Sequence, residues 1–270
     1  MSGKMKMVTY EQQQAFARDG VVCLRGALDD RWQRTAFDAW QWSVTNPGPL
    51  ASGLLPGADE TLQDLCNPGA LDHYSPLVHE GPLADYAADL WGADKVWFMY
   101  EQVFHKQGGS AGRTPWHQDT SYLAVDGPHL IAFWISFEAI PRACALEFVR
   151  GSHRGTLYNT SRFDPDDPTL PGVPSEDVPR LPDIEADRGA FDIVGFDTEP
   201  GDVVAFHTSA LHGGGPVDTT NPERRTLTLR FFGPQTWGAT RPGPAGPFYE
   251  DIRSITPGEP FRHPRFARVR

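Results

Sequence analysis

His117 and Asp119 are the first residues in the sequence whose types and spacing indicate chemistry. In an extended chain, residues two positions apart point to the same face, so this imidazole and this carboxylate could chelate one metal ion. His212, far along the chain, can supply a third ligand. Two imidazoles and one carboxylate on one face of an octahedron leave three positions open, an arrangement that suits non-haem Fe(II). The three residues therefore predict an iron site able to bind a substrate and O₂.

A His-x-Asp pair alone is common at strand ends and in turns, so the context of this pair decides its meaning. His212 comes after the turn and strand of Glu199–His207 and before Arg224–Arg230, a predicted strand that begins with two arginines. A guanidinium at that place could form a bidentate pair with a dicarboxylate. Because strand residues alternate between faces, only one of Arg224 and Arg225 can point inward.

These motifs, in this order, resemble the phytanoyl-CoA dioxygenase family of Fe(II)- and 2-oxoglutarate-dependent oxygenases. The similarity covers most of the chain, and its matching segments are Ala15–Val22, Trp116–Asp119, Ala145–His153, Pro200–Asp202, His212 and the strand that begins at Arg224. The resemblance implies that His117, Asp119 and His212 bind the iron and that Arg224 pairs with the distal carboxylate of 2-oxoglutarate. It also implies a double-stranded β-helix core.

Several positions near the expected co-substrate depart from the family pattern or allow two interpretations. Trp134 matches a tryptophan that some family members place against 2-oxoglutarate, and it could equally be a core aromatic residue. Members often have Ser or Thr two residues after the distal histidine, where this chain has Gly214. Another hydroxyl, for which Thr226 is the candidate, must then substitute. Arg224 lies slightly further from His212 than the family pattern suggests, so Arg225 stays an alternative.

The elements that must position these residues are helices followed by short strands. Capping residues and apolar spacing predict helices over Tyr10–Arg18, Asp29–Val44 and Pro82–Trp91, and the intervening 48–69 segment is rich in loop formers. Runs of β-branched and aromatic residues predict strands at Val21–Leu24, Lys95–Lys106, His129–Glu138, Ala145–Arg150, Asp202–His207 and Arg224–Phe232. The fold is therefore expected to be mainly β with N-terminal helices and, from the resemblance, a jelly-roll or cupin-like core.

The length of 270 residues fits one oxygenase domain. Within it we expect a mostly helical part over 1–94, a β core over 95–233 and a C-terminal extension over 234–270. Residues 158–188, rich in Pro and Asp, resemble an insertion or lid within the β core.

Composition restricts the partners. The formal net charge of −11 disfavours nucleic-acid and membrane-surface roles, and three scattered cysteines fit a reducing compartment. No stretch of about 18 apolar residues occurs, and Met1–Val8 lacks the apolar run of a secretory signal. We therefore expect a cytoplasmic enzyme, a monomer or homodimer, that acts on a small molecule.

The implied reaction consumes 2-oxoglutarate and O₂ at Fe(II) and hydroxylates an unactivated C–H bond, with release of succinate and CO₂. Asp119 is present, so halogenation, which in relatives accompanies loss of the carboxylate, is not expected. Candidate substrate residues are Gln102, His105, Lys106 and Tyr122, some of which could face the cavity and bind a polar or anionic group. The alternative is a non-oxidative cupin-type isomerase or epimerase, which would not depend on 2-oxoglutarate. His207 could compete with His212 as a ligand, but we expect it to support the strand.

Overall fold

The N-terminal part of the chain folds into helices that end at predicted capping residues. The protein is described by a computed structural model that covers residues 7–53, 61–109 and 111–270. Thr9 and Gln12 form a capping box at the start of the first helix, and Gly20 ends it with a left-handed φ of 78°. The helices of this part are α1 (Tyr10–Asp19), α2 (Asp30–Thr45), α3 (Leu71–His79) and α4 (Leu83–Trp91).

Two antiparallel sheets form the rest of the core. The larger sheet has the strand order β1 (Val21–Leu24), β9 (Val203–Phe206), β6 (Leu130–Ser136), β11 (Arg224–Phe232), β3 (Trp97–Lys106), β2 (Thr61–Leu65). The smaller has the order β4 (Thr114–His117), β10 (His212–Gly214), β7 (Leu146–Val149), β8 (Ile193–Gly195). The two packed sheets make a jelly roll, the double-stranded β-helix that was expected.

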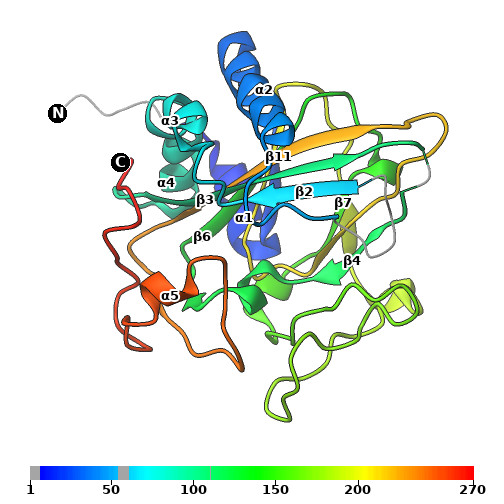
Figure 1. Cartoon of the computed structure of the whole chain (residues 1–270), viewed down its shortest axis with the longest axis vertical. Coiled ribbons are helices and arrows are strands. Elements are labelled where there is room, and N and C mark those ends of the chain that lie inside the picture. Colours follow the sequence, from blue (N-terminus) through cyan, green and yellow to red (C-terminus); the bar gives the residue numbers. More distant parts are fainter. Residues whose placement is uncertain (1–6, 54–60, 110) are drawn as a thin grey trace.

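Side chains of the larger sheet alternate between two hydrophobic cores. Phe133 and Ile135 of β6 pack with residues of α1 to α4, while Trp134 between them packs toward β7 and β8 of the smaller sheet. Figure 1 shows the helices gathered on one side of the larger sheet. The inner face of that sheet is therefore left free to form a cavity with the smaller sheet.

Most predicted elements of the sequence are confirmed, but the segment 48–69 is more ordered than expected. It contains β2, which pairs with β3 at the edge of the larger sheet, and residues 54–60 of it lie outside the described residues. The burial of β2 does not alternate cleanly, because it is an edge strand with mixed contacts, so its sequence lacks the usual signal. Helix α3 was also not predicted.

Two long segments pack around the β core. Residues 158–187 run as loops with a single bridge, between Ser161 and Pro171. The C-terminal segment includes β12 (Trp237–Gly238), which pairs with β5 (Val125–Asp126), and α5 (Tyr249–Ile252). Its last residues return to the start of β3, where Val269 donates a backbone hydrogen bond to Val96. Within the described residues, no helix has the length and apolar character needed to cross a membrane.

Candidate metal centre and cavity

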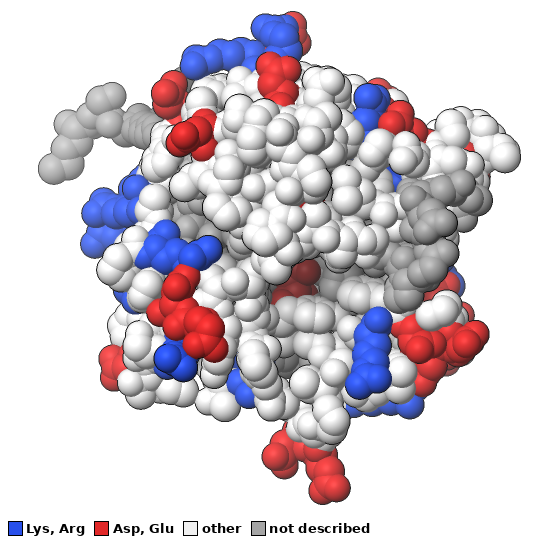
Figure 2. All heavy atoms as spheres, viewed as in Figure 1, with Lys and Arg blue, Asp and Glu red and all other residues white. Residues whose placement is uncertain are grey.

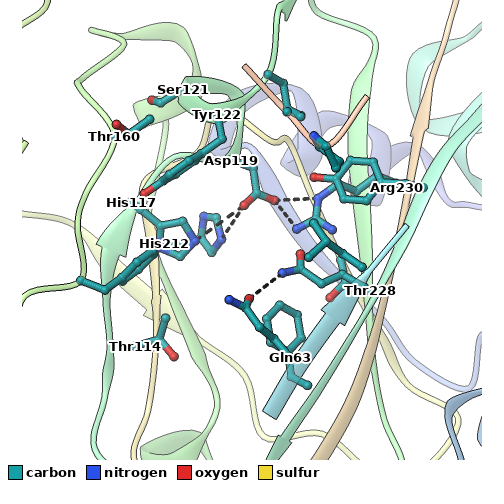
Figure 3. A pocket seen from close by; sticks show the side chains of 18 of the residues that line it. Gln63, Thr114, His117, Asp119, Ser121, Tyr122, Thr160, His212, Thr228 and Arg230 are labelled. Carbon is teal, nitrogen blue, oxygen red and sulfur yellow. Dashed lines mark hydrogen bonds and ion pairs between the residues drawn. The ribbon is translucent and has the colours of Figure 1, made fainter. Parts of the chain in front are cut away.

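His117, Asp119 and His212 come together at one end of the smaller sheet. Nε2 of His117 lies 3.6 Å and Nε2 of His212 lies 3.8 Å from Oδ1 of Asp119. One ligand atom from each residue can be chosen so that all lie within 4.8 Å of one another. Figure 3 shows the two imidazoles and the carboxylate pointing toward a common point. The donor set of two nitrogens and one oxygen fits Fe(II) in a facial arrangement.

Local backbone sets the orientation of both imidazoles. Nδ1–H of His117 donates to the carbonyl of Pro115 at 2.8 Å, and Nδ1–H of His212 donates to that of Ala210 at 2.9 Å. These bonds leave each Nε2 free to bind a metal ion. Burial lowers the pKa of His212 to about 3, which keeps its imidazole neutral. The extended backbone at Gln118 gives the predicted same-face arrangement of His117 and Asp119.

His207, the competing histidine, has other partners. Its Nδ1 accepts a hydrogen bond from the backbone N–H of Ser209, and its Nε2–H donates to the carbonyl of Gly127. Both ring nitrogens of His207 therefore have hydrogen-bond partners.

Asp119 forms a buried ion pair with Arg230, a residue that the sequence analysis did not identify. Nη2 of Arg230 lies 2.8 Å and Nε lies 3.0 Å from Oδ2 of Asp119, so Oδ1 remains free for a metal ion. The guanidinium also lies over the ring of Tyr100 at 4.7 Å. Burial acts to raise the pKa of Asp119, but Arg230 and the two histidines lower it well below its ordinary value. The carboxylate is therefore ionised before any metal binds.

One face of β11 carries a polar row that leads to this ion pair. Arg224, Thr226, Thr228 and Arg230 line the cavity between the sheets. The intervening Leu227 and Leu229 pack into the helical core. Strand alternation in Arg224–Phe232 is the signal that could have revealed Arg230, because it places an arginine six residues after Arg224 on the same face.

The cavity itself has a volume of about 500 Å³. Its walls include the metal centre, the polar row of β11, the edge strand β2 with its neighbour β3, and loops from residues 158–188 and 241–247. Figure 2 shows a hollow on this face, with acidic atoms in its depth and mostly uncharged residues around it. The volume lies within the usual range for small-molecule sites.

Arg224 fits the role of carboxylate partner. Its Nη1 donates to the backbone carbonyls of Cys144 and Gly215, and it has no ion pair with an acidic side chain among residues 7–53, 61–109 and 111–270. A buried guanidinium without an anion is costly, so this end of the cavity suits an anionic ligand. Arg225 points to the other face, where its Nε lies 3.2 Å from Oε2 of Glu138. The alternation thus favours Arg224 over Arg225.

Gly214 leaves room for this guanidinium. A Cβ at Gly214 would lie 3.1 Å from both Nη2 of Arg224 and Oγ1 of Thr114. Thr114 therefore brings a hydroxyl to the place where a side chain at position 214 would point, in addition to Thr226, which also lines the cavity. Thr114 was missed because it lies three residues before His117, a spacing that normally puts two strand residues on opposite faces. A bulge between β4 and β10 brings both residues to the same face.

The other predicted site residues divide between the cavity and its surroundings. Trp134, Gln102 and Tyr122 line the cavity. His105 instead lies on the opposite face of β3, where Nε2 is 2.7 Å from Oε1 of Glu223, so the expectation that it approaches a substrate is corrected by strand alternation. Lys106 is fully buried behind the cavity wall, and Nζ donates to the carbonyl of Gly112 at 2.6 Å.

The segment after His117 attaches the 158–188 loop to the site. Nε2 of Gln118 donates to the carbonyl of Thr156, and Oε1 of Gln118 accepts from the backbone N–H of Tyr158. The hydroxyl of Tyr122 accepts from the backbone N–H of Ser161 at 2.8 Å. Phe163 of the same loop packs edge-on against His117 with ring centroids 5.2 Å apart. The loop thus forms part of the cavity wall next to the metal centre.

Lys106 allows a prediction on pH dependence. Burial, with the nearby cations Arg224 and Arg113, lowers the pKa of Lys106 to about 6. The unfolded chain keeps this ammonium protonated up to about pH 10.4. Between these values the unfolded state binds more protons, so the stability of the folded state rises with pH by up to about 1.4 kcal/mol per pH unit from this group.

We therefore expect Lys106→Met to stabilise the metal-free protein most near pH 6.5, with the gain shrinking toward pH 9. The measurement is the free energy of unfolding by denaturant at several pH values for both proteins. A difference that stays constant over this range would show that Lys106 is charged in the folded state.

Comparison of the sequence with models of protein families identifies the family of this chain. The family model described as "Phytanoyl-CoA dioxygenase (PhyH)" matches residues 16–226. No curated protein matches the sequence of this chain.

Solved structures with the same fold are distant in sequence. The "non-heme alpha ketoglutarate dependent carbocyclase SnoK from nogalamycin biosynthesis" matches with a TM-score of 0.73 and 18% identity, and the match covers 100% of both chains. The "epimerase SnoN in complex with Fe3+, alpha ketoglutarate and nogalamycin RO" gives 0.70 and 17%, with 96% of this chain and 98% of that one covered. "EctD from S. alaskensis with 2-oxoglutarate and 5-hydroxyectoine" gives 0.65 and 19%, with 96% and 88% covered. At these low sequence identities, the similarity shows a shared fold and nothing more.

Proposed function

Because this chain belongs to the phytanoyl-CoA dioxygenase family, we propose that it is an Fe(II)- and 2-oxoglutarate-dependent oxygenase that hydroxylates a C–H bond of a small molecule. The observation that carries the proposal is the convergence of His117, Asp119 and His212 on one point at the base of a cavity. The alternative of a non-oxidative isomerase has less support, because it does not by itself account for Arg224, a buried cation in the cavity wall that has no acidic partner among the described residues.

In this proposal the iron is bound by Nε2 of the two histidines and Oδ1 of Asp119. When bound, iron with 2-oxoglutarate and O₂ supplies the oxidising chemistry, and the co-substrate leaves as succinate and CO₂. Arg224 pairs with the distal carboxylate of 2-oxoglutarate. Trp134, Thr226 and the hydroxyl of Thr114 form the wall around that molecule.

The remaining residues of the chain position these groups and exclude water. Arg230 holds Oδ2 of Asp119, which leaves Oδ1 directed at the metal. Phe163 and Tyr122 cover the side of His117 that faces the cavity. These aromatic rings would help to exclude solvent from the reacting C–H bond.

The test is succinate formation by protein reconstituted with Fe(II) without oxygen and then given 2-oxoglutarate and O₂. We expect succinate that requires all three components. Incorporation of ¹⁸O from ¹⁸O₂ into a product separates hydroxylation from ring closure or epimerisation, the reactions named for SnoK and SnoN. Turnover that proceeds without 2-oxoglutarate would instead favour a non-oxidative isomerase. A cytoplasmic location and a monomer or homodimer stay predictions.

A further inference from the structure

The charges that line the cavity are few, and most already have partners. Among the described residues, the ionisable groups of the wall apart from tyrosines are His117, Asp119, His212, Arg224, Arg230 and Arg241. The first three form the metal centre, and Arg230 is paired with Asp119. Two cations, Arg224 and Arg241, therefore remain as possible partners for a charged substrate.

Neither of these cations is free. Nη2 of Arg241 lies 2.6 Å from Oδ1 of Asp126 and also donates to the carbonyl of Val125. Nε of Arg241 donates to the carbonyl of Thr120. Arg224 is occupied by the co-substrate if the proposed function holds. A charged substrate would therefore lose its hydration in the cavity without gaining an ion pair.

Beside the polar row of β11, the cavity wall formed by β3 and β2 carries a chain of side-chain amides among mostly apolar residues. Nε2 of Gln102 donates to Oε1 of Gln63 at 3.0 Å, and Nε2 of Gln63 donates to Oγ of Ser52 at 3.3 Å. Figure 3 shows Gln63 across the cavity from Asp119 and His212. Around the amides lie Leu50, Leu65, Tyr100, Phe104 and Leu123.

The amide chain leaves hydrogen-bonding capacity unused. Gln102 employs one N–H, so its second N–H and its Oε1 are without a partner among the described residues. Both glutamines are half-buried, and a polar group withdrawn from water without a partner is costly. A neutral oxygen that accepts from the amide, or a hydroxyl that also donates, would satisfy these groups.

We propose that the substrate of this site is an uncharged, largely apolar molecule that presents a carbonyl or hydroxyl oxygen to Gln102 and Gln63 while a C–H bond faces the metal centre. This inference rests on the proposed function and adds the class of substrate to it. It narrows the expectation that residues such as Gln102, His105 and Lys106 bind a polar or anionic group to a neutral polar group at Gln102.

The test compares probes that share one carbon skeleton and differ in a single terminal group, which is neutral, anionic or cationic. One series has three fused rings: 2-(hydroxymethyl)anthraquinone, anthraquinone-2-carboxylate and 2-(aminomethyl)anthraquinone. A second is linear: 1-decanol, decanoate and decylammonium. Binding of each to the protein loaded with Fe(II) and 2-oxoglutarate is measured without oxygen by equilibrium dialysis. In at least one series we expect the neutral member to bind about tenfold or more tightly than either charged member.

Variants of Gln102 link this selectivity to the amide. Gln102→Leu is expected to weaken binding of the preferred neutral probe by about tenfold. Gln102→Lys should shift the preference toward the carboxylate of the same series. Gln41→Leu and Gln41→Lys, on the exposed face of α2, are the matched controls and should leave all the affinities unchanged. Thermal unfolding of each variant checks that it folds.

Different results would overturn the two proposals. If Fe(II) and 2-oxoglutarate bind and support succinate formation, but a charged probe binds as tightly as its neutral relative in both series, only the substrate class is wrong. Failure of both neutral probes to bind the loaded protein would overturn it too. If Fe(II) or 2-oxoglutarate does not bind, the proposed function is wrong.

Discussion

Replacing Asp119 by Ala is expected to abolish succinate formation and also to destabilise the fold. The loss of activity should exceed the roughly 10–100-fold that removal of an outer partner of a metal ligand costs, because the ligand itself is gone. The loss of stability follows from Arg230, whose buried guanidinium would have no acidic partner among the described residues. Breaking a buried pair in this way costs about 3–5 kcal/mol.

A double variant separates the two effects. In Asp119→Ala/Arg230→Met the uncompensated charge is absent, so most of the lost stability should return while succinate formation and Fe(II) binding stay absent. The measurements are denaturant unfolding of the metal-free proteins, iron content after anaerobic loading, and succinate yield. Succinate at the wild-type rate in either variant would contradict the assignment of Asp119 as a ligand. Equal stability of the two variants would contradict the role of the ion pair.

Replacing Arg224 by Ala is expected to raise the KM for 2-oxoglutarate by about 10–100-fold. The reason is the loss of the charge-assisted pair between the guanidinium and the distal carboxylate of 2-oxoglutarate, which is worth about 1.5–3 kcal/mol. A loss of about 1.4 kcal/mol weakens binding by a factor of ten. Iron binding should persist, because Arg224 lies at the other end of the polar row on β11 from Arg230 and Asp119. The measurement is the dependence of the succinate rate on 2-oxoglutarate concentration, together with iron content.

Arg225→Ala is the matched control. Its guanidinium pairs with Glu138 and lies over Phe37 on the opposite face of the strand. We expect the KM for 2-oxoglutarate to stay within about twofold of wild type, since the guanidinium of Arg225 does not line the cavity. A large rise in KM for Arg225→Ala, with none for Arg224→Ala, would mean that the strand faces of β11 are assigned the wrong way round.

The fold was predictable where local signals are strong. Thr9, Gly20 and Gly92 are capping residues that determine helix ends from a few neighbouring positions. The central strand β6 is a continuous apolar run, and β11 alternates polar and apolar residues. The edge strand β2 was missed, because residues 61–65 have few buried side chains and acquire their structure by pairing with β3.

The site was predictable where a motif lies within a short segment and unpredictable where it depends on distant contacts. His117 and Asp119 could be identified from their spacing. Strand alternation could place Arg230 on the inner face of β11, but its pairing with Asp119 could not be identified, because the two residues are 111 positions apart. This carboxylate is buried and neutralises a buried cation, which its place in the sequence does not reveal. Thr114 escaped because a bulge breaks the alternation that sequence reasoning assumes.

The two faces of β11 have a consequence for how the protein can evolve. The strand pairs on both sides, with β3 and with β6, and it separates the polar row from the helical core. Insertion of one residue within it would exchange the two faces, burying arginines among the helices and exposing leucines to the cavity. The loops at 158–188 and 241–247 line the same cavity without this double constraint. A change of substrate through altered loops is therefore expected to disturb the fold less than a change in the length of β11.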